Sequence, residues 1–159
     1  MNRRYALKSE DTEQIAVIDW ARWNEGKHPE LKWLYHVPNG GSRNKLEAVK
    51  LKQMGVRAGV SDLCLPYPKG IYCGLYIEMK YGTNRQQDSQ KSFLNDMEKA
   101  GHYVATCYSA DAAIKVLENY LGLISATCPM YPEEMLKRMV MPEENNSIFK
   151  GGTIKRSGK

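Results

Sequence analysis

Two carboxylates and a lysine lie beside short apolar segments near the middle of this sequence. Asp62 precedes the segment 63–65, and Glu78, sixteen residues after Asp62, is followed closely by Lys80 at the end of a second apolar segment. Both segments have the composition of strands, and the stretch 66–70, rich in Pro and Gly, predicts a turn between them. Neighbouring strands lie about 5 Å apart, so a single divalent cation would reach both carboxylates.

These residue types suit the hydrolysis of a phosphate ester. Glu78 and Lys80 are two positions apart and point to the same face of a strand, where an isolated charge would be costly to bury. Asp62 and Glu78 offer hard oxygen ligands for Mg²⁺ or Mn²⁺, with the carbonyl of Met79 as a third ligand. Lys80 would contact the attacking water or a phosphate oxygen. Spacing alone leaves an alternative open, in which Asp62 caps a turn and Glu78 and Lys80 form an exposed ion pair.

The composition is that of one folded domain with a basic surplus. Of the 159 residues, 42% are hydrophobic, which argues against general disorder. No apolar run approaches the roughly 20 residues of a membrane span, and no signal-peptide core follows the N-terminus. The net charge of +5 fits a nucleic-acid partner. We expect a cytoplasmic protein of a bacterium or a phage-infected cell.

The cysteines and histidines show no metal-ligand spacing. No pair of cysteines is separated by two residues, so a structural zinc site is not expected. We predict that the cysteines are small apolar fillers in a reducing compartment and that the histidines are ordinary core or surface residues. The residues concerned are Cys64, Cys73, Cys107, Cys128, His28, His36 and His102.

Hydrophobic periodicity and turn residues predict an α/β fold with a mixed central sheet flanked by helices. The segments 75–79 and 103–107, joined by a helix, should pair in parallel through a right-handed crossover. The expected helices are 12–24, 43–54, 85–100 and 110–121, and the expected strands are 33–37, 63–65, 71–79 and 103–107. Asp11 or Thr12 would cap the first helix, Gly55 would end the second, and Ser109 would cap the last.

The end of the chain is less regular. We predict a single domain over 1–141, made of a core at about 10–121 and an extension at 122–141 that includes a further helix from Pro132. The apolar residues of this extension would pack on their own core or across a dimer interface. The segment 142–159 is predicted to be a disordered basic tail, either simply solvated or contacting the DNA backbone.

Five ordered segments resemble one nuclease family. They are His36-Val37-Pro38-Asn39-Gly40-Gly41, Lys50-Leu51-Lys52-Gln53-Met54-Gly55-Val56, Gly59-Val60-Ser61-Asp62-Leu63, Ile77-Glu78-Met79-Lys80 and Gln90. The arrangement Asp62…Glu78-x-Lys80 resembles the PD-(D/E)XK nuclease superfamily, and the wider set looks like its virus-type replication-repair nuclease (VRR-NUC) domain. The resemblance implies a restriction-endonuclease-like core. Ala58 stands where the family pattern usually has proline, which the chemistry does not need.

The resemblance also implies roles for residues outside the central motif. Gln90 matches a glutamine expected near the metal-bound water, which makes it a fourth candidate catalytic residue beside Asp62, Glu78 and Lys80. Glu10 matches an added metal ligand at the start of the first helix, although Glu10 could instead be an ordinary acid at a helix start. Glu13 competes with Glu10 for this role, and Gln14 would line the same cleft.

Several polar residues have two interpretations. The turn 38–41 and the helix start after it would hold a phosphate, or would be a strand-to-helix turn capped by Ser42. The helix 43–54 carries Arg43, Lys45, Lys50 and Lys52, which would face phosphates or only solvent. Arg85, Gln86 and Gln87 would steer a DNA strand.

The resemblance predicts a metal-dependent, structure-specific DNA endonuclease, which leaves 5′-phosphate and 3′-hydroxyl ends and acts in DNA repair. Branched DNA such as a Holliday junction is the expected substrate, and two symmetric cuts imply a homodimer. The alternatives are a flap, nicking or restriction-type nuclease, a non-catalytic DNA-binding module and a structural protein. The last leaves Asp62, Glu78 and Lys80 without a reason.

Overall fold

A computed structural model of the chain describes residues 8–39 and 45–124. These residues all belong to Met1–Ala126, the first of the two units into which the chain divides. The predictions for the turn at Gly40-Gly41, for Ser42 and Arg43, for the extension beyond 124 with Cys128, and for the tail 142–159 lie outside the described residues. Among the residues that are described, no helix has the length and apolar character needed to cross a membrane.

Four strands form one mixed sheet in the order β1 (Tyr35–His36), β2 (Leu63–Leu65), β3 (Leu75–Met79) and β4 (Tyr103–Cys107). The pairs β1–β2 and β2–β3 are antiparallel, and β3 and β4 are parallel. The mixed sheet and the parallel pairing across a helix are therefore as predicted. The β2–β3 register pairs Leu63 with Ile77, which brings the start of β2 beside the end of β3.

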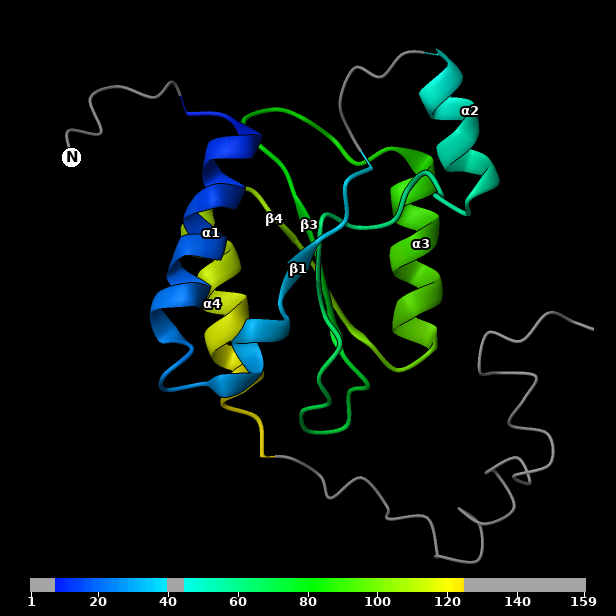
Figure 1. Cartoon of the computed structure of the whole chain (residues 1–159). Coiled ribbons are helices and arrows are strands. Elements are labelled where there is room, and N and C mark those ends of the chain that lie inside the picture. Colours follow the sequence, from blue (N-terminus) through cyan, green and yellow to red (C-terminus); the bar gives the residue numbers. More distant parts are fainter. Residues whose placement is uncertain (1–7, 40–44, 125–159) are drawn as a thin grey trace, which may run out of the picture. The chain divides into compact units, whose positions relative to one another are not determined.

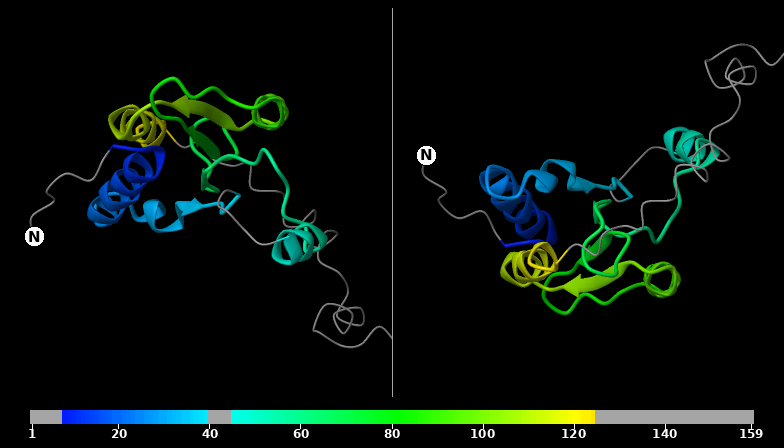
Figure 2. Two further views of the ribbon diagram at one scale, coloured as in Figure 1. Left: turned by 90° about the horizontal axis from the view of Figure 1, so that it is seen from above. Right: turned by 90° about the horizontal axis from the view of Figure 1, so that it is seen from below.

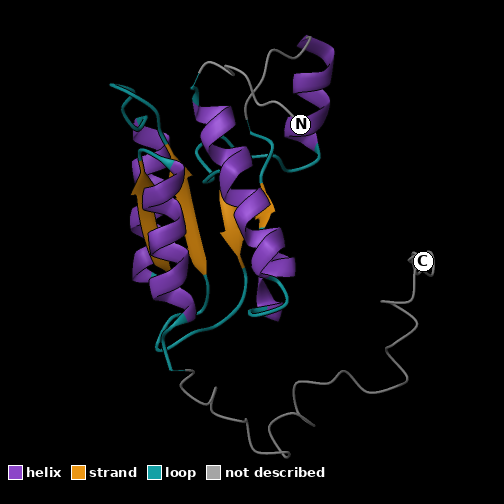
Figure 3. Cartoon of the chain, turned by 90° about the vertical axis from the view of Figure 1, so that its left-hand side faces the viewer, coloured by secondary structure: helices purple, strands orange, loops and turns teal. Residues whose placement is uncertain are grey.

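Helices cover both faces of this sheet (Figures 1 and 3). On one face α1 (Glu10–Asn24) packs against α4 (Ala110–Leu121), and the two lie side by side in both views of Figure 2. On the other face α3 (Asp88–Lys99) packs against β4. The main core lies between the sheet and the α1–α4 pair, and it includes Val17, Leu63, Leu75, Ile77, Met79, Leu117 and Tyr120.

The first helix differs from its prediction in its cap. It begins at Glu10 because Ser9 and Thr12 form a reciprocal capping box, so the predicted caps Asp11 and Thr12 were wrong. Its buried residues are Val17 and Ala21, whereas Ile15 is 57% exposed. Small side chains at this interface allow α1 to lie close to α4.

The first strand is shorter than predicted. Pro29 starts a 3-10 helix, η1 (Pro29–Trp33), so Trp33 belongs to a helix and only Tyr35–His36 remain as β1. Proline favours the first turn of a helix because its φ is already fixed there. β3 likewise begins at Leu75 rather than at Ile71.

The remaining helices end or begin close to the predicted positions. α2 (Lys45–Gln53) is followed by Gly55, whose φ of +98° suits the residue after a helix. α3 begins three residues later than predicted, and α4 is capped by Ser109 as predicted. Cys64 and Cys107 are buried apolar fillers, whereas Cys73 is exposed, contrary to its prediction.

One glycine allows two backbones to meet beside Asp62. Gly59 has a φ of +86°, and a Cβ atom at this position would lie 2.6 Å from the carbonyl carbon and oxygen of Ser89. Ser89 lies in the first turn of α3. The loop that leads into Asp62 is therefore packed directly on the start of α3.

We expect Gly59→Ala to lower the free energy of unfolding by at least about 2 kcal/mol, because it combines backbone strain with a clash against a main chain. Gly55→Ala is the matched control, since Gly55 also has a positive φ but would place its Cβ in open space. Urea denaturation of both variants would measure the difference. Equal losses would show that backbone strain alone sets the requirement for glycine.

Candidate active site

The sheet register brings Asp62 and Glu78 together. Asp62 directly precedes β2, and Glu78 lies in β3 one position beyond Ile77, which pairs with Leu63. The main-chain N–H of Met79 donates a 2.7 Å hydrogen bond to Asp62 Oδ2. Asp62 is thus fixed to the strand that carries Glu78, as the hairpin prediction required.

The carboxylate of Glu78 is the most enclosed charged group among the described residues, with no exposed surface. Its Oε1 atom accepts hydrogen bonds from Lys80 Nζ, at 2.6 Å, and from Gln90 Nε2. Its Oε2 atom has no hydrogen-bond partner within the described part of the chain. One oxygen is therefore fully engaged, and the other is buried without a donor.

Lys80 lies on the same face as Glu78, as their spacing predicted, and is 4% exposed. Its ammonium group also donates to the carbonyl oxygen of Met79, at 2.9 Å, and lies 3.9 Å from Glu10 Oε1. Two of its three N–H donors are used in these contacts with Glu78 and Met79. The third remains for a group in the adjoining pocket.

Gln90 reaches Glu78 because of a local cap at the start of α3. Its Oε1 atom accepts a 2.8 Å hydrogen bond from the main-chain N–H of Gln87. This bond fixes the amide plane and leaves Nε2 directed to Glu78. The same side chain therefore caps the helix and holds the buried carboxylate.

Glu10 and Glu13, which the sequence left as competitors, have different surroundings. Glu10 lies near Lys80, and its side chain is 35% exposed. Glu13 Oε2 instead accepts a 2.6 Å hydrogen bond from the main-chain N–H of Ala110, the first residue of α4. Glu13 caps a distant helix, so Glu10 is the acid that the fold brings to the other candidate residues.

A second set of contacts fixes the main chain at Asp62. The carbonyl oxygen of Asp62 accepts hydrogen bonds from the Val37 N–H and from His36 Nδ1, at 2.8 and 2.9 Å. His36 Nδ1 also lies 2.9 Å from the side-chain amide of Gln14. If Nδ1 carries the proton donated to Asp62, the Gln14 amide must turn its oxygen toward the ring. Gln14 thus reaches the site through His36.

A polar pocket of about 330 Å³ opens beside the ammonium group of Lys80. The residues that line it are Glu10, Lys80, Asn84, Arg85, Gln87 and Gln90. Gln86 is directed elsewhere, since its Nε2 atom donates to Thr106 Oγ1. Of the three residues expected to steer DNA, Arg85 and Gln87 therefore line this pocket and Gln86 braces β4.

The pKa of Glu78 is raised to about 7, chiefly by burial; the hydrogen bond and charge of Lys80 oppose this shift, and the negative charges of Asp62 and Glu10 add to it. A carboxylate in this position is short of positive charge and of hydrogen-bond donors. The residues thus form an acidic centre with one buried lysine, open to a polar pocket.

The donor set fits a hard divalent cation. Glu78 Oε2 is a buried oxygen without a donor, and Asp62 and Glu10 are the neighbouring carboxylates that raise its pKa. Within the described residues, no three His, Cys, Asp or Glu side chains lie together in a group that could hold a metal ion by themselves. The carbonyl oxygen of Met79, a predicted ligand, accepts a hydrogen bond from Lys80.

Two residues of the site were missed in the sequence. His36 had been treated as an ordinary histidine, yet its ring contacts the main chain of Asp62. Asn84 lines the pocket although the sequence indicated only a loop there. His36 begins a segment that resembles the nuclease family, and this could have indicated its role at the site. Nothing in the sequence indicated a role for Asn84.

We predict that Glu13→Ala lowers the free energy of unfolding by about 1–2 kcal/mol, because it removes an acceptor from the N-terminus of α4. Glu10→Ala should leave stability unchanged or raise it, since it removes a charge that disfavours ionised Glu78. Chemical denaturation at pH 7.5 in EDTA would measure both. A greater loss from Glu10→Ala would contradict the division of roles between these acids.

Stability should fall as the pH rises from about 4.5 to about 7 in EDTA. The folded-state pKa of Glu78 exceeds its ordinary value of 4.5, so in this window the folded protein binds more protons than the unfolded chain. The loss approaches about 3 kcal/mol at 1.4 kcal/mol per pKa unit. Melting curves of Glu78→Gln, which does not titrate, should lack this decline, and an identical decline in the variant would refute the assignment.

Comparisons with known proteins agree with this geometry. The family model described as the VRR-NUC domain matches residues 7–111, a span that contains every candidate residue discussed above. A solved structure described as a VRR_NUC domain protein superimposes with a TM-score of 0.64 at 32% identity, covering 75% of this chain and 94% of the other. No curated protein sequence matches the chain. The chain belongs to the VRR-NUC family, and its described fold is a nuclease-type domain.

Proposed function

We propose that this protein is a metal-dependent endonuclease that hydrolyses phosphodiester bonds in DNA, with branched DNA as its substrate. The observation that carries the proposal is the buried Glu78 carboxylate, held by Lys80 and Gln90 beside Asp62, with one oxygen lacking a donor among the described residues. A carboxylate placed in this way is destabilised unless a cation approaches it. Membership of a nuclease family supports the reaction class.

The chain's own residues would position the reactants. The free N–H donor of Lys80 faces the polar pocket, where it would orient the attacking water or hold a phosphate oxygen. Gln90 would keep Glu78 in place, and Arg85 would balance the charge of the substrate. Water adds across the P–O3′ bond: a new P–O bond forms, the bond to O3′ breaks, and O3′ leaves as a hydroxyl.

Asp62 and Glu78 would hold a divalent cation, with Glu10 as an added ligand and the Met79 carbonyl as a further one. When bound, Mg²⁺ or Mn²⁺ would act as a Lewis acid on the phosphate and the water. The side-chain charges of Asp62, Glu78, Glu10 and Lys80 sum to −2 when all are ionised. The cation therefore relieves repulsion that these residues would otherwise exert on DNA.

Branched DNA is the preferred substrate because the described residues include no helix or ribbon placed as a separate reader of base sequence. A protein without such a module selects DNA by shape and backbone charge. If the junction has two symmetric strands, two active sites are required, so we propose a homodimer. A flap or nicking nuclease would use the same residues in a single-site enzyme.

Cleavage of labelled four-way junction, flap and linear duplex DNA would test the function. We expect cutting of the junction in Mg²⁺ or Mn²⁺ and none in EDTA. Lys80→Ala should reduce the rate at least about 100-fold, because it removes the group that orients water and phosphate. Lys115→Ala, which removes an exposed lysine on α4, is the matched control and should cut at the wild-type rate.

The other outcomes separate the alternatives. Faster cutting of flaps by a monomer, measured by sedimentation, would retain the nuclease and replace the junction as substrate. Binding of all three substrates with no cutting in either metal would favour a non-catalytic DNA-binding module. Melting curves of Lys80→Ala are needed beside the rates, since an unfolded variant would also be inactive.

A further inference from the structure

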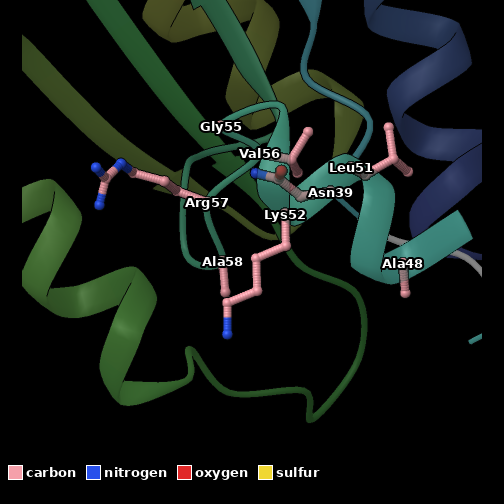
Figure 4. A pocket seen from close by; sticks show the side chains of 8 residues that line it. All are labelled: Asn39, Ala48, Leu51, Lys52, Gly55, Val56, Arg57 and Ala58. Atoms are coloured by element: carbon pink, nitrogen blue, oxygen red, sulfur yellow. The ribbon is translucent and has the colours of Figure 1, made fainter. Parts of the chain in front are cut away.

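A second and larger pocket lies between α2 and the segment 55–58 that follows it (Figure 4). Its volume is about 680 Å³, within the range of small-molecule sites. The residues that line it are Asn39, Ala48, Leu51, Lys52, Gly55, Val56, Arg57 and Ala58. None of them belongs to the candidate active site, and nothing in the proposed reaction uses them.

The chemistry of this pocket is apolar with a cationic rim. Ala48, Leu51 and Val56 supply the apolar surface, and no acid is found among the described residues that line it. Lys52 and Arg57 extend away from the centre of the group in Figure 4 and end in charged groups. A suitable ligand therefore has an apolar portion of moderate size and at least one negative charge.

The helix above the pocket displays the same mixture. Two apolar side chains of α2 are exposed, Leu46 at 84% and Val49 at 56%. Residues 45–58 contain three lysines and one arginine but a single acid, Glu47. A surface that is apolar and strongly positive at once is unusual for a solvated helix and suits a nucleic-acid partner.

The main chain connects this pocket to the candidate active site. Ala58 lines the pocket, and the next residue, Gly59, packs directly on Ser89 in the first turn of α3. Ser89 lies between Gln87 and Gln90, which line the polar pocket beside Lys80. The segment that leaves the larger pocket therefore packs on the turn of α3 whose residues line the polar pocket.

A second anchor ties the pocket to Asp62. Asn39, which lines the pocket, donates a 2.8 Å hydrogen bond from Nδ2 to the carbonyl oxygen of Val60. Val60 lies two residues before Asp62. The larger pocket is therefore held to the loop that carries Asp62.

We propose that the pocket between α2 and 55–58 binds an unpaired nucleotide of the DNA strand that is cut, an inference that rests on the proposed nuclease function. The base would lie against Ala48, Leu51 and Val56, and its flanking phosphates would contact Lys52 and Arg57. Bases in a duplex are stacked and paired, whereas a branch point or a flap supplies a free one. The pocket thereby selects branched DNA over linear duplex.

A second copy of this chain is a poorer occupant. The whole chain carries a net charge of +5, so a second copy would bring more positive charge on average to a pocket whose charged lining, among the described residues, is Lys52 and Arg57. DNA supplies both the negative charge and the flat apolar group that the lining requires. Charge complementarity therefore decides between the two occupants.

Fluorescence of 2-aminopurine would test the site in Lys80→Ala protein with EDTA, so that no cleavage is required. The probe base would be placed unpaired at the branch of a forked DNA, and in a second DNA it would be paired within a duplex. Ala48→Trp, on an exposed helix position, should fill the pocket and abolish the change in fluorescence of the unpaired probe without removing any charge. Circular dichroism would confirm that the variant is folded.

The cationic rim requires a separate variant and a matched control. Lys52→Gln with Arg57→Gln should weaken binding of the forked DNA at least tenfold and reduce the slope of log affinity against log salt by about 0.7 for each phosphate that the variant no longer neutralises. Lys99→Gln with Lys115→Gln removes the same charge from exposed positions on α3 and α4 and should change neither quantity by as much.

The proposal would be overturned if protein binding changed the fluorescence of the paired and unpaired probes equally. An equal loss of affinity in the two double variants would also overturn it. Binding assays of this kind do not depend on cleavage. A protein that binds the unpaired base but cuts no DNA would refute the nuclease function and leave the nucleotide site intact. If the protein cuts branched DNA and Ala48→Trp affects neither binding nor rate, the nuclease function would stand and the nucleotide site would be refuted.

Discussion

Burial of one carboxylate, Glu78, is the constraint on which the arrangement of this domain depends. A charge without solvent exposure is tolerated only when donors or cations are held against it. Lys80 and Gln90 meet this need at one oxygen, and each is fixed by a main-chain partner of its own, the Met79 carbonyl and the Gln87 N–H. The start of α3 and the end of β3 are therefore locked to a single side chain.

The scaffold around this group is built to bring separate segments to one end of the sheet. Antiparallel pairing of β2 with β3 brings Asp62 beside Glu78. Parallel pairing of β3 with β4 requires a crossover, and α3, which forms it, carries Gln90 in its first turn. The first turn of α1 contributes Glu10 from the opposite layer. The loop before Asp62 is held on α3 by the close approach at Gly59.

Local signals predicted most of the fold. The strands 63–65 and 103–107 and the capped helix 110–121 were predicted from periodicity, turn residues and Ser109. The errors arose where distant packing decided the outcome. Hydrophobicity alone would favour Ile15 for the buried face of α1, but the face that packs on α4 buries Val17 and Ala21 and leaves Ile15 57% exposed.

The candidate site divides in the same way. The period of two in a strand placed Glu78 and Lys80 on one face, and the predicted hairpin brought Asp62 beside them. The choice between Glu10 and Glu13 could not be made, because Glu13 is occupied by the N-terminus of a helix that begins 97 positions later. The contact of His36 with the Asp62 main chain also depends on strand pairing that a single segment does not reveal.

The bond between Glu13 and Ala110 has a consequence for how the protein is made. The ribosome produces α1 first and α4 last among the described helices, yet α1 packs mainly on α4. A nascent chain that ends before Ala110 already contains Asp62, Glu78 and Lys80, but it lacks the helix on which α1, which carries Glu10, mainly packs. The packing that positions α1, and Glu10 with it, is therefore complete only once α4 has been made.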